Sequence, residues 1–222
     1  MHRPITHLSS GQDLSARVRA GELPAYVERE KDRTELRPAL AAAANGEQPP
    51  VRLVLITGAS LAGKTRTAIE AMRAELPTWR LLIPRSARSL AQLLTAGFGL
   101  RHIVVWLNEI QEFLRENEGV ERLNRLLDLP TGPIVLLATL SSDAEEALRD
   151  TAGWWLLQRA AHRIMLQRRP PRDDFERELA RGRSLDDPWI AEALSKIGDR
   201  YGIAEWLGAG PQLVPRPRRL AL

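Results

Sequence analysis

The sequence predicts an α/β fold, in which a parallel sheet of about five strands is flanked by helices and followed by a short C-terminal helical lid segment. Three apolar stretches carry this prediction: VRLVLIT at 51–57, HIVVWL at 102–107 and IVLLAT at 134–139. Strands that are apolar at almost every position are buried on both faces. Their alternation with helical stretches is typical of a parallel sheet covered by helices.

The remaining elements follow from periodicity and from start and stop signals. Residues 28–44 are charged and then rich in alanine up to Asn45-Gly46, which predicts a helix that Pro38 kinks or splits. Ser142 and Glu145 are spaced as a capping box for a helix that reaches about Asp150. The same patterns predict further helices at 64–76, 89–96, 110–116 and 120–127, and further strands at 79–83 and 163–167.

Changes in composition divide the chain into four parts. Residues 1–22 are polar without periodicity and are expected to form a tail, whereas residues 23–169 form the core domain. Residues 170–214 are expected to form the helical lid-like segment, with a helix that Asp187 caps, Pro188 begins and Gly198 ends. Residues 215–222 are basic and rich in proline, and we expect a disordered tail there.

Composition excludes several classes of protein. The 222 residues contain no cysteine, which excludes disulfides, thiolate zinc sites and cysteine nucleophiles. The apolar stretches are far too short to span a membrane, and the first residues have no apolar signal-peptide core, so a cytoplasmic location is expected. The net charge is only +4, because the pI of 10.1 reflects arginine in place of lysine. This balance argues against a nucleic acid as partner.

One glycine-rich segment has the spacing of a phosphate-binding loop. Gly58-Ala59-Ser60-Leu61-Ala62-Gly63-Lys64-Thr65 reads GxxxxGKT, after a predicted buried strand and at the start of a predicted helix. In such a loop the backbone amides converge on phosphate oxygens, the lysine reaches the β- and γ-phosphates, and the threonine hydroxyl ligates Mg²⁺. Arg66, the next helical residue, joins the candidate nucleotide-binding residues. The alternative is a glycine-rich turn that matches by chance.

Polar residues follow two other predicted strands. Asn108 and Glu109 come directly after the strand at 102–107. In one large division of P-loop ATPases an acidic metal-shell residue and a catalytic glutamate stand there, so Glu109 is a candidate to orient or deprotonate the attacking water. Asn108 replaces the expected aspartate, which predicts weaker Mg²⁺ binding and slower hydrolysis. The alternative is a helix cap followed by a first-turn acid.

Thr139 ends the predicted strand at 134–139. A polar residue there is a candidate to sense the γ-phosphate or to hold the attacking water, and the alternative is an ordinary strand-ending threonine. Such a site can bind ATP or GTP. The chain has no Asn/Thr-Lys-x-Asp segment of the kind that reads guanine, so ATP is preferred.

The lead-in to the loop resembles a known family. Leu23-Pro24-Ala25-Tyr26-Val27-Glu28-Arg29-Glu30, with Asp32, is similar to the "hydrophobic-x-Arg-Glu" segment of STAND-type NTPases and related AAA+ proteins. The resemblance covers roughly 23–214 and includes the phosphate loop, HIVVWLNEIQEFL, GPIVLLATL and the lid-like stretch from Asp187. It implies that Val27 and Arg29 lie close to the adenine. Three positions depart from the family pattern: Asn108, Leu140 and Gly208-Ala209-Gly210-Pro211.

The sequence therefore predicts an α/β P-loop NTPase that binds ATP with Mg²⁺. The resemblance implies a switch in signalling or defence, with slow or impaired hydrolysis and with a second copy or a signalling protein as partner. A small-molecule kinase is the alternative, since an arginine-rich lid could be formed by Arg159, Arg163, Arg168 and Arg169. A nucleotide-holding scaffold without turnover is the third possibility.

Overall fold

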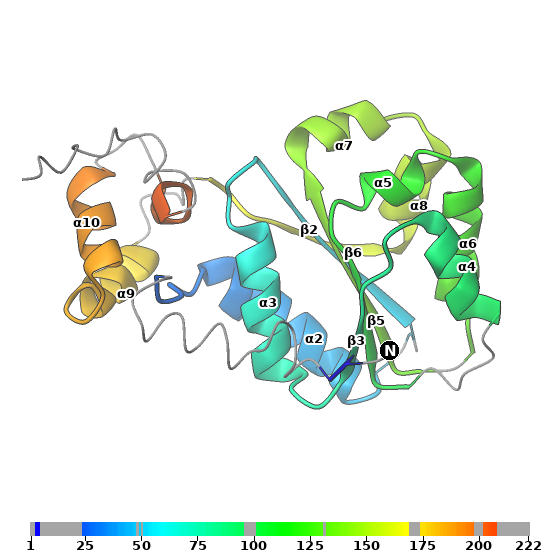
Figure 1. Ribbon diagram of the computed structural model, residues 1–222, viewed down its shortest axis with the longest axis horizontal. Coiled ribbons are helices and arrows are strands. Elements are labelled where there is room, and N and C mark those ends of the chain that lie inside the picture. The colour runs from blue at the N-terminus through cyan, green and yellow to red at the C-terminus, as the bar shows by residue number, and fades with distance from the viewer. Residues whose placement is uncertain are drawn as a thin grey trace, which may run out of the picture.

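A six-stranded sheet with the order β1-β3-β4-β5-β2-β6 organises the molecule (Figure 1). The computed structural model describes residues 3–4, 24–47, 49, 51–95, 101–130, 132–168, 174–197 and 202–207. The strands are β1 (Arg3–Pro4), β2 (Val51–Gly58), β3 (Arg80–Leu82), β4 (Ile103–Leu107), β5 (Ile134–Ser141) and β6 (Ala161–Met165). Five of them run parallel, and β1 pairs antiparallel with β3. The predicted α/β class with a five-stranded parallel sheet is confirmed.

Helices cover both faces of the sheet, as the apolar strands require. One face carries α2 (Arg37–Ala44) and α3 (Lys64–Glu75), and the other carries α4 to α8 (Figure 1). These are α4 (Ala87–Thr95), α5 (Gln111–Leu114), α6 (Asn117–Leu127), α7 (Ser142–Leu148) and α8 (Ala152–Ala160). Alternate residues of β2 enter the two cores, with Leu53 and Leu55 facing α4 to α8 and Val54 and Ile56 facing α2 and α3. Among the residues described, no helix is both long and apolar enough to cross a membrane.

The predicted helix at 28–44 is observed as one helical run over 30–44, which is not split at Pro38. A π-helical turn, η2 (Asp32–Leu36), leads directly into α2, and Leu36 and Arg37 at the junction both have helical backbone angles. The π-helical turn lies directly before Pro38, where the ring and the missing N–H disturb regular α-helical bonding. The helix ends at Asn45, and Gly46 follows with a φ of 74°.

Several sequence expectations near the strand ends were wrong. Strand β5 runs to Ser141, so Thr139 lies inside the strand and not at its end, and it pairs with Ile56 in register. The helix cap is Ser141, whose Oγ accepts from the amide of Ala144 at 3.2 Å, rather than Ser142. The strand continues because β2 keeps pairing with it as far as Gly58 and Ser141, whereas the pairing with β4 stops at Leu107 and Ala138.

Two further elements were not predicted. Residues 3–4, within the expected N-terminal tail, form the short edge strand β1, and α8 lies in a stretch for which no helix was assigned. His102 was expected to open β4, but it precedes the strand with a φ of 53° and is exposed. The predicted features at Gly198, at 208–211 and in the tail at 215–222 lie outside the described residues.

The C-terminal helices pack beside the sheet and not on it (Figure 1). They are α9 (Asp174–Ser184), α10 (Pro188–Lys196) and a short helix at 203–207. Asp187 caps α10 as predicted, since its Oδ1 accepts from the amides of Trp189 and Ile190. A separate apolar cluster joins these helices to Val27 of the lead-in. The C-terminal helices are therefore attached to the chain segment that enters the phosphate loop from the N-terminal side.

Two helical glycines provide a test of the packing between α5 and α6. A Cβ on Gly119 in α6 would lie 1.8 Å from the backbone oxygen of Phe113, whereas a Cβ on Gly182 in α9 would meet no atom within 4 Å. We expect Gly119→Ala to lower the free energy of unfolding by about 2 kcal/mol or more, because backbone must shift. We expect Gly182→Ala to raise it by about 0.5–1 kcal/mol. Urea unfolding measures both, and equal effects would contradict the described packing.

Candidate nucleotide-binding site

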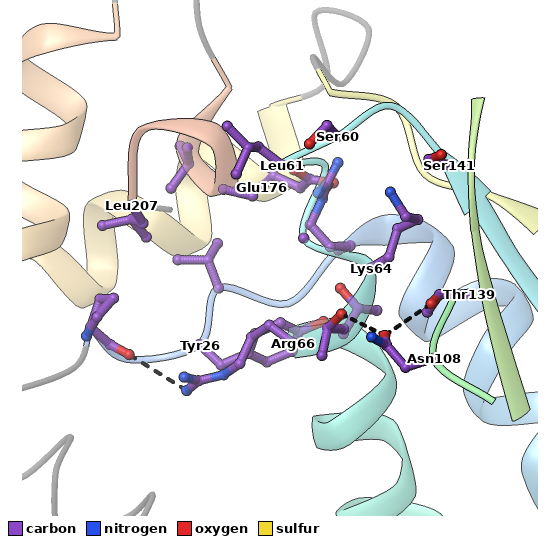
Figure 2. Close-up of a pocket in the computed structure, with 18 of the residues that line it drawn as sticks. Tyr26, Ser60, Leu61, Lys64, Arg66, Asn108, Thr139, Ser141, Glu176 and Leu207 are labelled. Carbon is purple, nitrogen blue, oxygen red and sulfur yellow. Dashed lines mark hydrogen bonds and ion pairs between the residues drawn. The ribbon is translucent and has the colours of Figure 1, made fainter. Parts of the chain in front are cut away.

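A cavity of about 450 Å³ lies at the carboxyl ends of β2, β4 and β5. Lys64, Asn108 and Thr139 line one side of it, and Tyr26 and Leu207 line the other (Figure 2). Strand β2 lies between β5 and β6. After β2 the chain forms β3, β4 and β5 on one side of it, and β6 then pairs with its other edge. Ligands of open parallel sheets bind outside the strand ends at such a switch point.

The loop after β2 has a backbone that only particular residues tolerate. Gly58 has a φ of 146°, and a Cβ there would lie 2.2 Å from the backbone oxygen of Leu166. Gly63 has a φ of 85° and caps α3, which begins at Lys64. Leu61 also has a left-handed φ of 64° although it is not glycine. The loop therefore curls at three points and directs the start of α3, with its unpaired amides, into the cavity.

Lys64 holds the loop through its backbone oxygens. Its Nζ donates to the backbone oxygens of Gly58 at 2.9 Å and Ala59 at 2.8 Å. Burial lowers the pKa of the Lys64 ammonium below its ordinary value, and the nearby Glu109 carboxylate opposes that shift. A cation that already lies in the loop, and is partly stripped of water, interacts strongly with an anion that enters the cavity.

Asn108 connects the phosphate loop to β5. Its Oδ1 lies 3.3 Å from the hydroxyl of Thr65 and accepts from the hydroxyl of Thr139 at 3.0 Å (Figure 2). Thr139 is 2% exposed, and its position in β5 points it toward the face that α3 covers, together with Val135 and Leu137. Three polar side chains from three different elements therefore meet at one point.

Glu109 follows Asn108 in a left-handed conformation, with a φ of 56°. Its amide donates to Thr139 Oγ1 at 2.9 Å, and the next amide, that of Ile110, donates to the Thr139 backbone oxygen at 2.9 Å. These bonds hold a backbone conformation that a non-glycine residue rarely adopts. The exposed Glu109 side chain lines the cavity.

The donors around Asn108 fit a metal ion only in part. Within the described ranges, no group of three or more His, Cys, Asp or Glu side chains is placed to hold a metal ion. The Thr65 hydroxyl and the Asn108 amide are oxygen donors, as Mg²⁺ requires, but neither carries a charge. The residues therefore fit Mg²⁺ that arrives with the phosphates, and do not form a cage that would bind the ion alone.

The lead-in segment forms the opposite wall. Val27 is buried against the C-terminal helices, and Arg29 is 6% exposed with its guanidinium hydrogen-bonded to protein groups. Tyr26 donates from its hydroxyl to Asp32 at 2.8 Å, and burial raises the pKa of that hydroxyl far above its ordinary value. Arg66 lies over the Tyr26 ring at 5.9 Å and so reaches the lead-in.

Most of the candidate residues from the sequence line this cavity, but not all. Gly58, Ala59 and Ala62 form the back of the loop, and Ala62 packs into the core with α2 and α3. Of the arginines considered for a kinase lid, Arg159 contacts Asn124, Arg163 pairs with Glu145, and Arg168 donates to the backbone oxygen of Ser60 at 3.2 Å. Arg169 lies outside the described residues.

Sequence reasoning missed the wall that the C-terminal helices contribute. Glu176, Ile203, Ala204 and Leu207 line the cavity although they are distant from the loop in sequence. Tyr26 was part of the resemblance to the lead-in motif but was not assigned a role. The available signal was an aromatic ring two residues before the charged run Glu28-Arg29-Glu30.

The fold, a five-stranded parallel sheet flanked by helices with a phosphate loop after β2, is shared with solved structures. The solved ORC1 protein of Aeropyrum pernix, in complex with DNA, is similar with a TM-score of 0.51 and 18% identity, over 90% of this chain and 66% of that chain. The ORC2 protein of the same organism, solved as ADPNP–ADP complexes, has a TM-score of 0.57 and 17% identity, over 83% of this chain and 60% of that chain. No protein-family model and no curated protein sequence matches the chain.

At these identities the likeness concerns the fold alone. The chain spans less than two thirds of the length of either solved protein. The sequence-based argument against nucleic acid finds no support here, because one of the two similar proteins was solved in complex with DNA.

Replacing Thr139 tests the hydrogen bonds that hold Asn108 and Glu109. Thr139→Val keeps the shape but leaves the Glu109 amide and the Asn108 oxygen without this partner, so we expect the free energy of unfolding to fall by about 1–3 kcal/mol. Thr139→Ser keeps the hydroxyl and should recover most of that loss. Urea unfolding measures both variants, and a valine variant as stable as the original chain would contradict the described network.

Proposed function

We propose that this chain is an ATP-binding domain that works as a nucleotide-dependent switch with slow or impaired hydrolysis. One observation carries the proposal: the GxxxxGKT loop places Lys64 and Thr65 in a cavity that Asn108, Glu109 and Thr139 also line. A cation, a hydroxyl, a strand-end carboxylate and a buried hydroxyl at one sheet edge are the groups that bind and cleave a triphosphate.

Phosphate binding would exchange one set of bonds of Lys64 for another. The ammonium now satisfies two loop carbonyls, and a triphosphate would offer it charged oxygens in their place. The phosphate oxygens carry negative charge and so attract the ammonium more strongly than neutral carbonyl oxygens do, which makes the exchange favourable. The amides at the start of α3 would add their dipoles to the same phosphate groups.

The weak metal site supports slow turnover. Thr65 would hold Mg²⁺ and Asn108 would orient its water, and the bound ion would neutralise charge on the phosphate oxygens. Glu109 would hold the attacking water and accept its proton, while Thr139 would fix the Glu109 backbone. With an amide at position 108, the protein supplies less negative charge to the ion than a carboxylate would.

The apolar wall of the cavity supports a purine base at its other end. Ala25, Val27, Ile203 and Leu207 provide apolar surface there, and the chain has no segment of the type that reads guanine. Adenine beside Val27, with Arg29 close by, is the arrangement that the resemblance to STAND-type NTPases implies. In this proposal residues 23–169 form the nucleotide-binding core and residues 170–214 form the lid.

The strand order favours the switch over a small-molecule kinase. Strand β5, with Thr139, lies between the phosphate-loop strand β2 and the strand β4 that precedes Asn108. In small-molecule P-loop kinases, the strand before the phosphate loop and the strand before the acidic residue usually have no sensor strand between them.

We propose a second copy or a signalling protein as the partner and the cytoplasm as the location, in line with the absence of cysteine.

Lys64→Ala tests the nucleotide assignment. We expect the dissociation constant for ATP to rise by at least about tenfold, because the principal cation of the phosphate site is lost. Lys196→Ala, at the exposed last turn of α10, is the matched control and should leave binding unchanged. Isothermal titration with ATP and Mg²⁺ measures both, and unchanged affinity in Lys64→Ala would sink the assignment.

Asn108→Asp tests the account of slow hydrolysis. A carboxylate at this position should raise the rate of Mg²⁺-dependent phosphate release by about tenfold, which corresponds to a barrier lowered by roughly 1.4 kcal/mol. Glu109→Gln added to Asn108→Asp should remove that gain, since the proton acceptor is lost. Phosphate release from ATP without any co-substrate is the measurement. A rate that Asn108→Asp leaves unchanged would refute this explanation.

A further inference from the structure

The guanidinium of Arg29 joins three separate parts of the molecule. Its Nε donates to Glu176 Oε1 at 2.7 Å, its Nη1 to the backbone oxygen of Ala62 at 2.9 Å, and its Nη2 to the backbone oxygen of Gln167 at 2.7 Å. All three nitrogens are thus in use, and the planar fork of arginine is the side chain that can make these bonds together. Arg29 is 6% exposed and Glu176 is 5% exposed.

Burial makes this ion pair a poor device for stability alone. Removing two charges from water costs about as much free energy as their attraction returns, so apolar residues would stabilise this position equally well. The geometry instead fixes the orientation of the Arg29 guanidinium. Glu176 occupies one edge of the guanidinium, which leaves the other nitrogens directed at Ala62 in the phosphate loop and at Gln167 beyond β6.

The bond to Ala62 has a direct consequence for the phosphate site. A trans peptide unit places its C=O and its N–H on opposite sides. Because Arg29 fixes the direction of the Ala62 carbonyl, it also fixes that of the Gly63 amide in the same peptide unit, and Gly63 lines the cavity. That amide is one of the donors that cradle phosphate in such loops.

Glu176 lies in α9, which other contacts also attach to the lead-in. Arg33 lies over the ring of Phe175 at 4.1 Å, and the amide of Ala25 donates to Asp187 Oδ2 at 2.6 Å. The C-terminal helices and the lead-in therefore pack as one unit, and Arg29 is one polar connection from that unit to the back of the phosphate loop. Arg168, which pairs with Glu205 and donates to the Ser60 backbone oxygen, is another.

We propose that Glu176 is a positioning residue for the phosphate loop, which it orients through Arg29, and that this pair couples nucleotide binding to the packing of the C-terminal helices. The proposal deepens the proposed function and rests on it for the identity of the ligand. Coupling between two sites is reciprocal. If the contact between Glu176 and Arg29 strengthens ATP binding by a given factor, ATP strengthens that contact by the same factor.

The test compares Glu176→Ala and Glu176→Gln with Glu178→Ala in the full chain. Glu178 lies two residues further along α9 and is exposed, which makes it the matched control. The first readout is amide hydrogen exchange of residues 59–64 in the nucleotide-free chain, and the second is the dissociation constant for ATP with Mg²⁺. Arg29→Lys, which keeps the charge but loses the planar fork, is the complementary variant.

We expect Glu176→Ala and Arg29→Lys to raise both the exchange of the loop and the dissociation constant by about tenfold, within the usual range of coupling between sites. Glu176→Gln should have a smaller effect, because its amide oxygen still accepts from Nε. Glu178→Ala should change neither quantity. ATP should also slow exchange in α9 of the original chain, and less so in Glu176→Ala.

Three outcomes overturn the proposal. Loop exchange that is unchanged in a folded Glu176→Ala or Arg29→Lys variant shows that the pair does not act on the loop. Equal effects of the Glu176 and Glu178 variants show a general effect of charge. Normal ATP binding by Arg29→Lys shows that the fork is not needed. Failure of the original chain to bind ATP would instead refute the proposed function, and the exchange of the nucleotide-free loop would still decide the role of Glu176.

Discussion

The phosphate loop leaves the sheet through a space that has no room for a side chain. Strand β6 pairs with β2 as far as Thr57 and Met165, and the amide of Leu166 then donates to the Thr57 backbone oxygen at 2.8 Å. This brings the Leu166 oxygen against Gly58, where a Cβ would lie at 2.2 Å. The loop must therefore turn away from β6 at once, and this turn sets where α3 begins. The places of Lys64 and Thr65 in the cavity follow from that close approach.

The carbonyls of the loop are held by cations, and this arrangement prepares the amides. Lys64 binds the oxygens of Gly58 and Ala59, Arg168 binds that of Ser60, and Arg29 binds that of Ala62. Polar groups of the backbone that leave the sheet need partners, and here side chains supply them. Carbonyls that face these cations leave the adjoining amides free to converge on an anion. The loop is therefore held by protein groups in a curled conformation, and such preorganisation reduces the entropy that a ligand must overcome.

The fold class, the phosphate loop and the polar residues near the strand ends could be predicted from the sequence. Apolar runs locate β2, β4 and β5, and glycine spacing locates the loop, because both signals are local. The partners of those residues depend on contacts distant in sequence. Glu176 is 147 positions from Arg29, and no pattern near either residue indicates their pairing. Thr139 was placed at a strand end because the apolar run stops there, although pairing with β2 extends β5 to Ser141. Tertiary pairing overrode the local pattern at that edge.

The asparagine at position 108 is the shared hydrogen-bond acceptor of the site. Thr139 Oγ1 accepts from the Glu109 amide, so its single proton is available to Asn108, and Asn108 must therefore present its oxygen and turn its NH₂ group away. That one oxygen also lies 3.3 Å from the Thr65 hydroxyl. A carboxylate in the same place would carry a second oxygen and a charge, and would attract a cation more strongly. In the proposed function, the neutral amide would keep Thr65 and Thr139 together while supplying less negative charge to Mg²⁺, and slow hydrolysis would follow from that difference.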